Sequence, residues 1–184
     1  LSWDGTNVLS GDTNSGKIYL HSGFSSTISS SFSSPSTGSA GLSWDGTNVL
    51  DGDFNLNIIY LHSGFSSTIS NSFSSPSNGE STGFLGWDGA NVLSCDFNSD
   101  KIYKHTGFSS TITTSFSSPS NNPLESGWDG TNVLSGELFP QRFYLHSGFS
   151  STISNSFSSP STGQAGLSWD GTNVLSGDTN SGKI

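Results

Sequence analysis

Apolar residues occur along this chain in short runs separated by clusters of Ser, Asn, Asp and Gly. Short apolar runs bounded by turn-forming residues are typical of β-strands. In residues 24–32, alternation places Phe24, Ile28 and Phe32 on one face of an extended strand. Their spacing of four also fits a helix, but the Ser and Thr between them favour strands and turns over a helix interior. We therefore expect an all-β chain.

A tight hairpin is predicted where Asp-Gly, at 45–46, separates two such runs. Gly adopts positive φ without strain and Asp does so more readily than most residues, so the dipeptide favours a two-residue turn. In such a hairpin Trp44 pairs with Thr47 and Leu42 pairs with Val49, all on one face.

The remaining strands of this unit follow from further turn signals. Residues 12–16 are rich in side chains that hydrogen-bond their own backbone, so they predict a second turn, leading into a third strand at Lys17–His21. Ser22 and Gly23 turn again before the fourth strand. Pro35 and Gly38 mark the linker to the next unit. Four short strands per unit result.

The unit is repeated along the whole chain. A W-D-G-[TA]-N-V-L segment opens each copy, and its tryptophans are spaced 41, 43, 41 and 41 residues apart: Trp3, Trp44, Trp87, Trp128 and Trp169. We divide the single repeat array, residues 1–184, into units of about 1–41, 42–84, 85–125 and 126–166, with a partial unit at 167–184. A period of about 40–45 residues is typical of propeller blades and of two-helix solenoid repeats. The four-strand pattern favours a β-propeller of four-stranded antiparallel blades, with about four complete units and a partial fifth.

The repeat resembles the blades of the propeller superfamily that includes NHL-repeat, streptogramin-lyase-like and lactonase-like proteins. The residues that carry the resemblance are G-L-S-W-D-G at 41–46, Asp53 after the second strand, and Ile59 and Tyr60 on the third. The resemblance implies a blade, and fold alone does not specify an activity. WD40 repeats differ, because no Gly-His precedes the first strand here and Trp-Asp lies at a hairpin.

The two ends of the array have the same sequence, since residues 1–18 and 167–184 are identical. A four-bladed ring would be complete near residue 166, whereas a five-bladed ring would lack the outer half of its last blade. Either arrangement leaves an inner hairpin with an unpaired edge, which readily recruits another strand. We expect self-association through this incomplete blade, or continuation into a longer array.

Charge narrows the range of partners. The chain carries 14 acidic and 5 basic side chains, for a net charge of −9, so neither nucleic acid nor an anionic membrane is an expected partner. Only 10% of residues are charged, so uncharged polar residues must cover the surface, which suits assembly or extracellular exposure. The aromatic content of 12% argues against disorder.

Each complete unit contains one histidine, and together these are His21, His62, His105 and His146. Equivalent positions on neighbouring blades should lie well beyond the ~2 Å reach of a shared metal ion, so we expect hydrogen bonding within each blade and no metal site.

The turn after the second strand repeats oxygen-bearing side chains, as D-x-N at 12–14, 53–55 and 96–98. Such spacing could bind Ca²⁺, but no bidentate Glu follows and the fourth unit has Glu137-Leu138 instead. We favour plain turns, and we expect no cofactor.

The five tryptophans (Trp3, Trp44, Trp87, Trp128 and Trp169) are the candidate ligand-binding residues, because aromatic rings stack on sugars and one weak site per blade gives avidity. Packing in the core is the favoured alternative for them.

No catalytic site is expected, since an active site needs residues with different roles and normally breaks repeat symmetry. The residues unique to one unit form no convincing set: Glu80, Cys95, Lys104, Glu125 and the loop at 137–142. We therefore expect a non-catalytic structural or interaction scaffold, with a multivalent carbohydrate-binding propeller as the alternative and a lyase-like or lactonase-like enzyme as the less favoured one.

Overall fold

A computed structural model of the chain describes residues 1–76, 84–121 and 123–184, so Glu80 lies outside the described residues. All regular structure in these ranges is β-strand, as expected. No helix in this part of the chain is long and apolar enough to cross a membrane.

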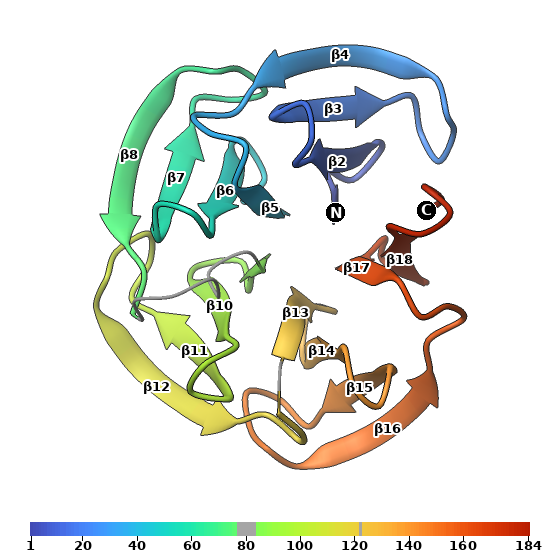
Figure 1. Ribbon diagram of the computed structural model, residues 1–184. Helices are drawn as coiled ribbons and strands as arrows, with labels where there is room; N and C mark the ends of the chain where they lie inside the picture. The colour runs from blue at the N-terminus through green and yellow to red at the C-terminus, as the bar shows by residue number, and fades with distance from the viewer. Residues whose placement is uncertain (77–83, 122) are drawn as a thin grey trace.

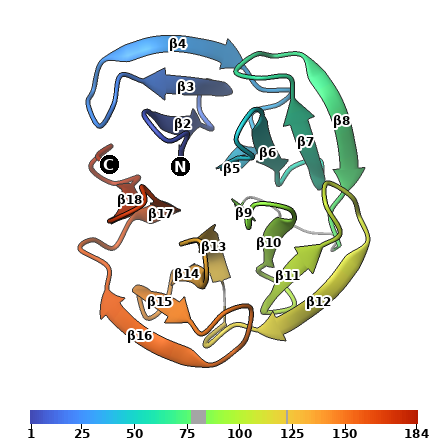
Figure 2. The same cartoon turned by 180° about the vertical axis from the view of Figure 1, so that it is seen from behind.

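Four antiparallel sheets of four strands follow one another around a ring (Figure 1), and Figure 2 shows them from behind. Blade 1 contains β1 (Ser2–Trp3), β2 (Val8–Asp12), β3 (Lys17–His21) and β4 (Ile28–Ser33). Blade 2 contains β5 (Ser39–Trp44), β6 (Val49–Asp53), β7 (Ile58–His62) and β8 (Ile69–Ser74). Blade 3 contains β9 (Leu85–Trp87), β10 (Val92–Asp96), β11 (Lys101–His105) and β12 (Ile112–Ser117). Blade 4 contains β13 (Pro123–Trp128), β14 (Val133–Glu137), β15 (Arg142–His146) and β16 (Ile153–Ser158).

A two-stranded sheet of β17 (Gln164–Trp169) and β18 (Val174–Asp178) forms a half-blade after blade 4. β17 contacts both β13 and β1, so the inner strands form a ring of five positions. Figure 1 shows β17 and β18 between β16 and the N-terminal strands, with the C-terminus beside β18. Of the two ring arrangements considered from the sequence, the chain has the five-position ring with an incomplete last blade.

The prediction of a two-residue hairpin turn is wrong. Trp44 pairs with Val49, and the four residues between them, 45–48, form the loop. The Asp45 carboxylate closes this loop by accepting hydrogen bonds from the backbone N–H groups of Thr47, at 2.8 Å, and Asn48, at 2.6 Å. A side chain that binds its own backbone in this way stabilises a wider turn than Asp-Gly alone predicts. Leu42 and Val49 nevertheless lie in the same core cluster, with Trp44 packed against it.

The fourth strand is shorter than predicted, since β4 begins at Ile28 and Phe24 lies in the preceding loop. A bulge between Leu20 and His21 interrupts the pairing of β3 with β4 and disrupts the simple alternation of side chains. Ile28 is therefore exposed, while Phe32 faces the next blade.

The core lies between blades. Leu9 and Ile18 of blade 1 pack against Leu42 and Val49 of blade 2, and all four are buried. Burial of each such side chain contributes about 1.5–3 kcal/mol. The second seam repeats this cluster, and the third has Cys95 among its four buried residues, so each blade depends on its neighbour for its stability.

Candidate functional site

The five tryptophans lie around one central channel. They line a cavity of about 100 Å³ together with the two residues that precede each of them on the inner strands. Each ring is partly buried and packs against the apolar cluster of a seam. The structure thus brings the candidate ligand-binding residues to a single channel, where they also belong to the core.

Glu125 lies toward the other end of this channel, near Leu1 and Gly166. Its carboxylate is fully buried, and among the described residues neither oxygen makes a hydrogen bond of normal geometry. Gly136, its pairing partner on β14, gives it room, since a Cβ at Gly136 would come within 2.5 Å of Glu125 Oε2. Burial raises the pKa of Glu125 to about 7, although the backbone of Gly166 favours the charged form.

The histidines are hydrogen-bonded within their own blades. His105 Nε2 lies 2.9 Å from Ser94 Oγ, and His146 Nε2 lies 2.9 Å from Ser135 Oγ, each pair joining the third strand to the second. In blade 1, His21 Nε2 lies 2.8 Å from Ser10 Oγ. Burial lowers the pKa of His146 to about 4, so the ring is neutral at pH 7.

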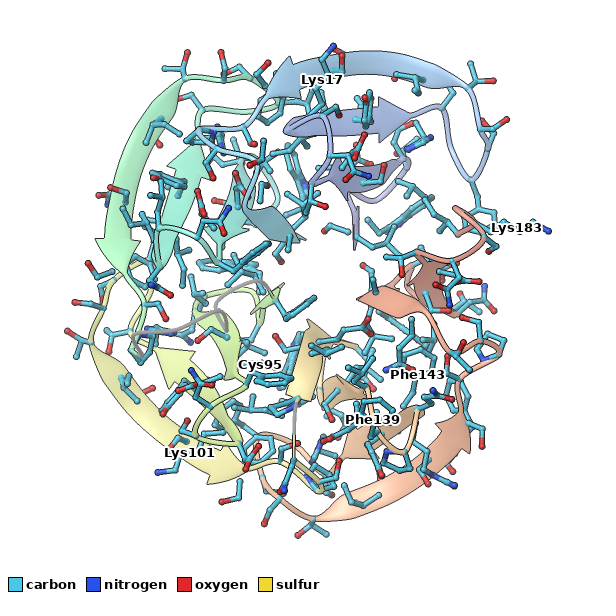
Figure 3. The ribbon with its side chains drawn as sticks, in the orientation of Figure 1. Lys17, Cys95, Lys101, Phe139, Phe143 and Lys183 are labelled. Atoms are coloured by element: carbon cyan, nitrogen blue, oxygen red, sulfur yellow. The ribbon has the colours of Figure 1, made fainter. Side chains whose placement is uncertain are left out.

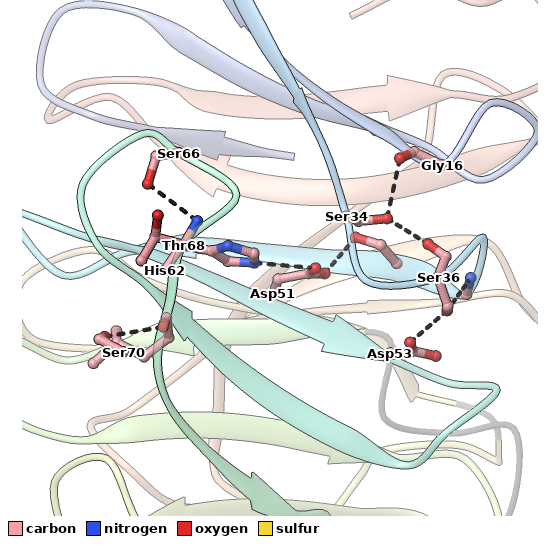
Figure 4. A network of polar contacts seen from close by, with 12 residues as sticks. Gly16, Ser34, Ser36, Asp51, Asp53, His62, Ser66, Thr68 and Ser70 are labelled. Atoms are coloured by element: carbon pink, nitrogen blue, oxygen red, sulfur yellow. Dashed lines mark hydrogen bonds and ion pairs between the residues drawn. The ribbon is translucent and has the colours of Figure 1, made fainter.

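Blade 2 has an aspartate in place of this serine. His62 Nε2 lies 3.5 Å from Asp51 Oδ2, and Ser39 Oγ donates a hydrogen bond to the same carboxylate (Figure 4). His62 and Asp51 are fully buried. Asp51 therefore lies between the serine and the histidine, and the histidine is not placed to remove a proton from the serine.

The aspartates at the ends of the second strands hold turns and linkers. Asp53 accepts a hydrogen bond from the backbone N–H of Asn55, at 2.9 Å, and another from the hydroxyl of Ser36 in the preceding linker. Glu137 accepts hydrogen bonds from Ser118 and Ser120 in the same way. No group of three or more His, Cys, Asp or Glu side chains that could hold a metal ion occurs in the described ranges.

An aromatic trio closes the outer part of each complete seam. Phe32 of blade 1 packs on His62, with ring centroids 5.0 Å apart, and meets Phe65 edge-on at 4.8 Å. The same trio recurs at the next two seams with nearly equal distances, in the sets Phe73, His105, Phe108 and Phe116, His146, Phe149. Edge-to-face ring pairs contribute about 0.5–1.5 kcal/mol beyond the area they bury.

The trio is incomplete on both sides of the half-blade. Phe157 of blade 4 is 48% exposed, and Phe24 of blade 1 is 60% exposed. We call the space beside β18, bounded by Phe157 on one side and by His21 and Phe24 on the other, the open seam. Figure 3 shows Lys183 at its edge.

A hollow of about 610 Å³ in the open seam is lined by Tyr19, His21 and Ile184 among others, and two further hollows lie along the seam. One, of about 360 Å³, is lined by His21, Phe24 and Ile184 among others. The other, of about 160 Å³, lies between blade 4 and the half-blade and is lined by Phe143, Phe157 and Val174 among others. Phe24 and Phe157 are not predicted as a site from the sequence, although the recurring G-F-S-S and S-F-S-S motifs mark their positions.

No protein-family model matches the chain, and no curated protein matches it. Solved structures share its fold. A chain in the crystal structure of a mitotic checkpoint complex superposes with a TM-score of 0.62 at 16% identity, covering 98% of this chain and 60% of that one. The computationally designed Ika8 protein gives 0.58 at 12% identity, covering 97% of this chain and 54% of that one.

Myxococcus xanthus glutaminyl cyclase gives a TM-score of 0.62 at 13% identity, covering 90% of this chain and 74% of that chain. The present chain spans less than two thirds of the length of the chain from the checkpoint complex and of Ika8. At these identities the likeness concerns the fold alone. The chain has the β-propeller fold, with four complete blades and a partial fifth.

Proposed function

We propose that this chain is a non-catalytic propeller scaffold that self-associates through its half-blade. The open seam is the observation that carries the proposal. Its phenylalanines, Phe24 and Phe157, are 60% and 48% exposed, whereas their counterparts at complete seams are at least partly buried. Exposed apolar surface next to an unpaired strand edge is typical of an interaction site.

The edge of β18 provides the backbone for association. β18 pairs with β17 along one side, and on the other side Asp178 forms a single bridge with Lys183. In blades 1 to 4 the second strand pairs with a third strand at every residue after its first valine. Antiparallel pairing of β18 with β18 of a second copy makes a continuous four-stranded sheet across two rings. Low charge favours this contact, because Asp178, at the end of β18, is the one charged residue of the strand and like-charge repulsion along the edge is small.

The non-catalytic part of the proposal is supported by the near-identity of the blades. The Ser–His pairs recur as links between strands, and those of blades 3 and 4 are buried. We also propose that the resemblance of the blade motif to NHL-repeat and streptogramin-lyase-like proteins concerns the architecture of the blade. Glutaminyl cyclase activity is a property of the structural neighbour and is not carried over.

Sedimentation velocity over a range of protein concentrations tests the association. We expect a monomer–dimer equilibrium in the wild-type chain and a monomer for Ser176→Lys, which places a charge on the open edge. Ser31→Lys, on the exposed outer strand β4, is the matched control and should still associate. A wild-type chain that remains monomeric at all concentrations would rule out self-association.

Carbohydrate binding is the second candidate, because five tryptophans line one channel. Titration of tryptophan fluorescence with simple sugars tests it, and no response at millimolar sugar would exclude it.

A further inference from the structure

We propose that the open seam receives a β-hairpin with the sequence of the repeat's third and fourth strands, and that this hairpin completes the fifth blade. The inference rests on the half-blade being the association surface proposed above. It names a second occupant of the β18 edge, which competes with β18 of another copy, together with the register of that occupant and the side chains that recognise it.

The register of the incoming strand is already set. Residues 167–184 repeat residues 1–18, and the bridge between Asp178 and Lys183 is the counterpart of the pair Asp12 and Lys17 in blade 1. The Asp178 N–H donates to the Lys183 carbonyl at 2.8 Å. In blade 1 the next pairs join Ser10 to Tyr19 and Leu9 to Leu20. A third strand that continues this ladder therefore places a Tyr beside Ser176 and a Leu beside Leu175.

The blade 4 side of the open seam fits the histidine and first phenylalanine of such a hairpin. Phe32 packs on His62 and Phe65 at the complete seam between blades 1 and 2. Phe157 holds the position of Phe32 in blade 4. An incoming His at the third-strand end can hydrogen-bond to Ser176, which holds the position of Ser94 in the Ser94–His105 pair.

The blade 1 side fits the second phenylalanine of the hairpin. His21 and Phe24 hold the positions of His62 and Phe65, and the hollow of about 360 Å³ between Phe24 and Ile184 lies where their aromatic partner would sit. One hairpin thus supplies all three aromatic groups that the two incomplete trios need. This match to the repeat's own pattern specifies the occupant better than exposed apolar surface alone would.

Exchange of strands between two copies does not supply this hairpin. The described residues contain five inner strand pairs, ending with β17 and β18, and four outer pairs, ending with β15 and β16. If one copy donated β3 and β4 to its partner, its own blade 1 would lose them, and the number of unfilled positions would stay the same. Exchange of the described strands therefore cannot fill every seam.

The probe is a synthetic peptide of residues 19–34, because Lys183 and Ile184 already hold the positions of Lys17 and Ile18. The matched control carries His21→Ala, Phe24→Ala and Phe32→Ala. We expect saturable one-to-one binding that slows hydrogen exchange at Val174 and Ser176. The control should bind at least ~100-fold more weakly, because large-to-alanine changes at buried aromatic positions cost several kcal/mol each.

A second variant addresses the cost of ordering a short peptide, since isolated hairpins are marginally stable. Residues 19–34 are appended after Ile184, with and without the three alanine substitutions. The unsubstituted extension should have a melting temperature higher by roughly 5 °C or more. Equal melting temperatures for the two extended chains, or equal binding of the two peptides, would overturn the inference.

The same experiments separate this inference from the proposed function. A chain that dimerises alone and neither binds the peptide nor gains stability from the extension keeps the proposed function and loses the inference. A chain that is monomeric alone but binds the peptide with the expected selectivity keeps the inference and loses self-association. If both hold, the peptide should convert dimers to monomers, because both partners use the edge of β18.

Discussion

Glu125→Gln should stabilise the protein at neutral and alkaline pH. Burial raises the folded-state pKa of Glu125 from 4.5 to about 7. A difference of about 2.5 in pKa corresponds to about 3 kcal/mol, at ~1.36 kcal/mol for each pKa unit. Because the pKa is raised on folding, the carboxyl group destabilises the fold only when it is ionised. Stability is therefore greatest below the unfolded-state value and is lost as pH rises through 7.

Urea denaturation from about pH 4 to about pH 8 measures this effect. The free energy of unfolding of the Gln variant, minus that of the wild type, should rise by about 3 kcal/mol over this range. Taking the difference removes other titrations, including that of His146, whose lowered pKa reduces stability as pH falls below the unfolded value. Ser31→Lys changes the net charge equally at an exposed position and should show no such rise. A constant difference across the range would refute the reasoning.

Three further results are expected. Burial raises the pKa of the Cys95 thiol well above its ordinary range, so the native protein should react with a thiol reagent at least ~100-fold more slowly than the denatured protein. Phe32→Ala should lower the free energy of unfolding by about 3–5 kcal/mol, whereas Phe157→Ala, at a half-exposed position, should lower it by about 1 kcal/mol. Urea titration of the two variants measures both losses, and equal losses would contradict a stabilising role for the aromatic trio. Asp51→Ser should change the free energy of unfolding by less than about 1 kcal/mol or increase it, because it replaces the buried Asp51–His62 contact with the Ser–His pair of the other blades. A loss above about 3 kcal/mol in the same assay would show that the His62 contact is strongly stabilising.

The fold could be predicted from the sequence because its signals are local and repeated. The turn at 12–16 and the third strand at Lys17–His21 follow from neighbouring residues, and the structure confirms that strand. The hairpin at 45–46 was assigned too short a turn, because the Asp45 carboxylate binds two backbone N–H groups that the Asp-Gly dipeptide alone does not reveal.

The site depends on contacts between units, which a repeat pattern does not contain. Phe24 and Phe65 occupy the same place in their units, yet only Phe65 has a phenylalanine from the preceding blade against it. Their environments differ because the half-blade of β17 and β18, which precedes blade 1 around the ring, has no outer strands in the described residues. The burial of Glu125 likewise depends on the inner strand of the next unit. In the sequence alone, Glu125 can be recognised only as a residue that departs from the repeat.

Hydrogen exchange at β18 as a function of protein concentration tests most directly whether the half-blade is an association surface. The amides of Val174 and Ser176, which point away from β17, should exchange quickly in dilute solution and slowly at high concentration, as the edge of β18 becomes paired. Those of β14, which is paired on both sides in a complete blade, should exchange slowly throughout. Exchange at Val174 and Ser176 that does not change with concentration would contradict association through the half-blade.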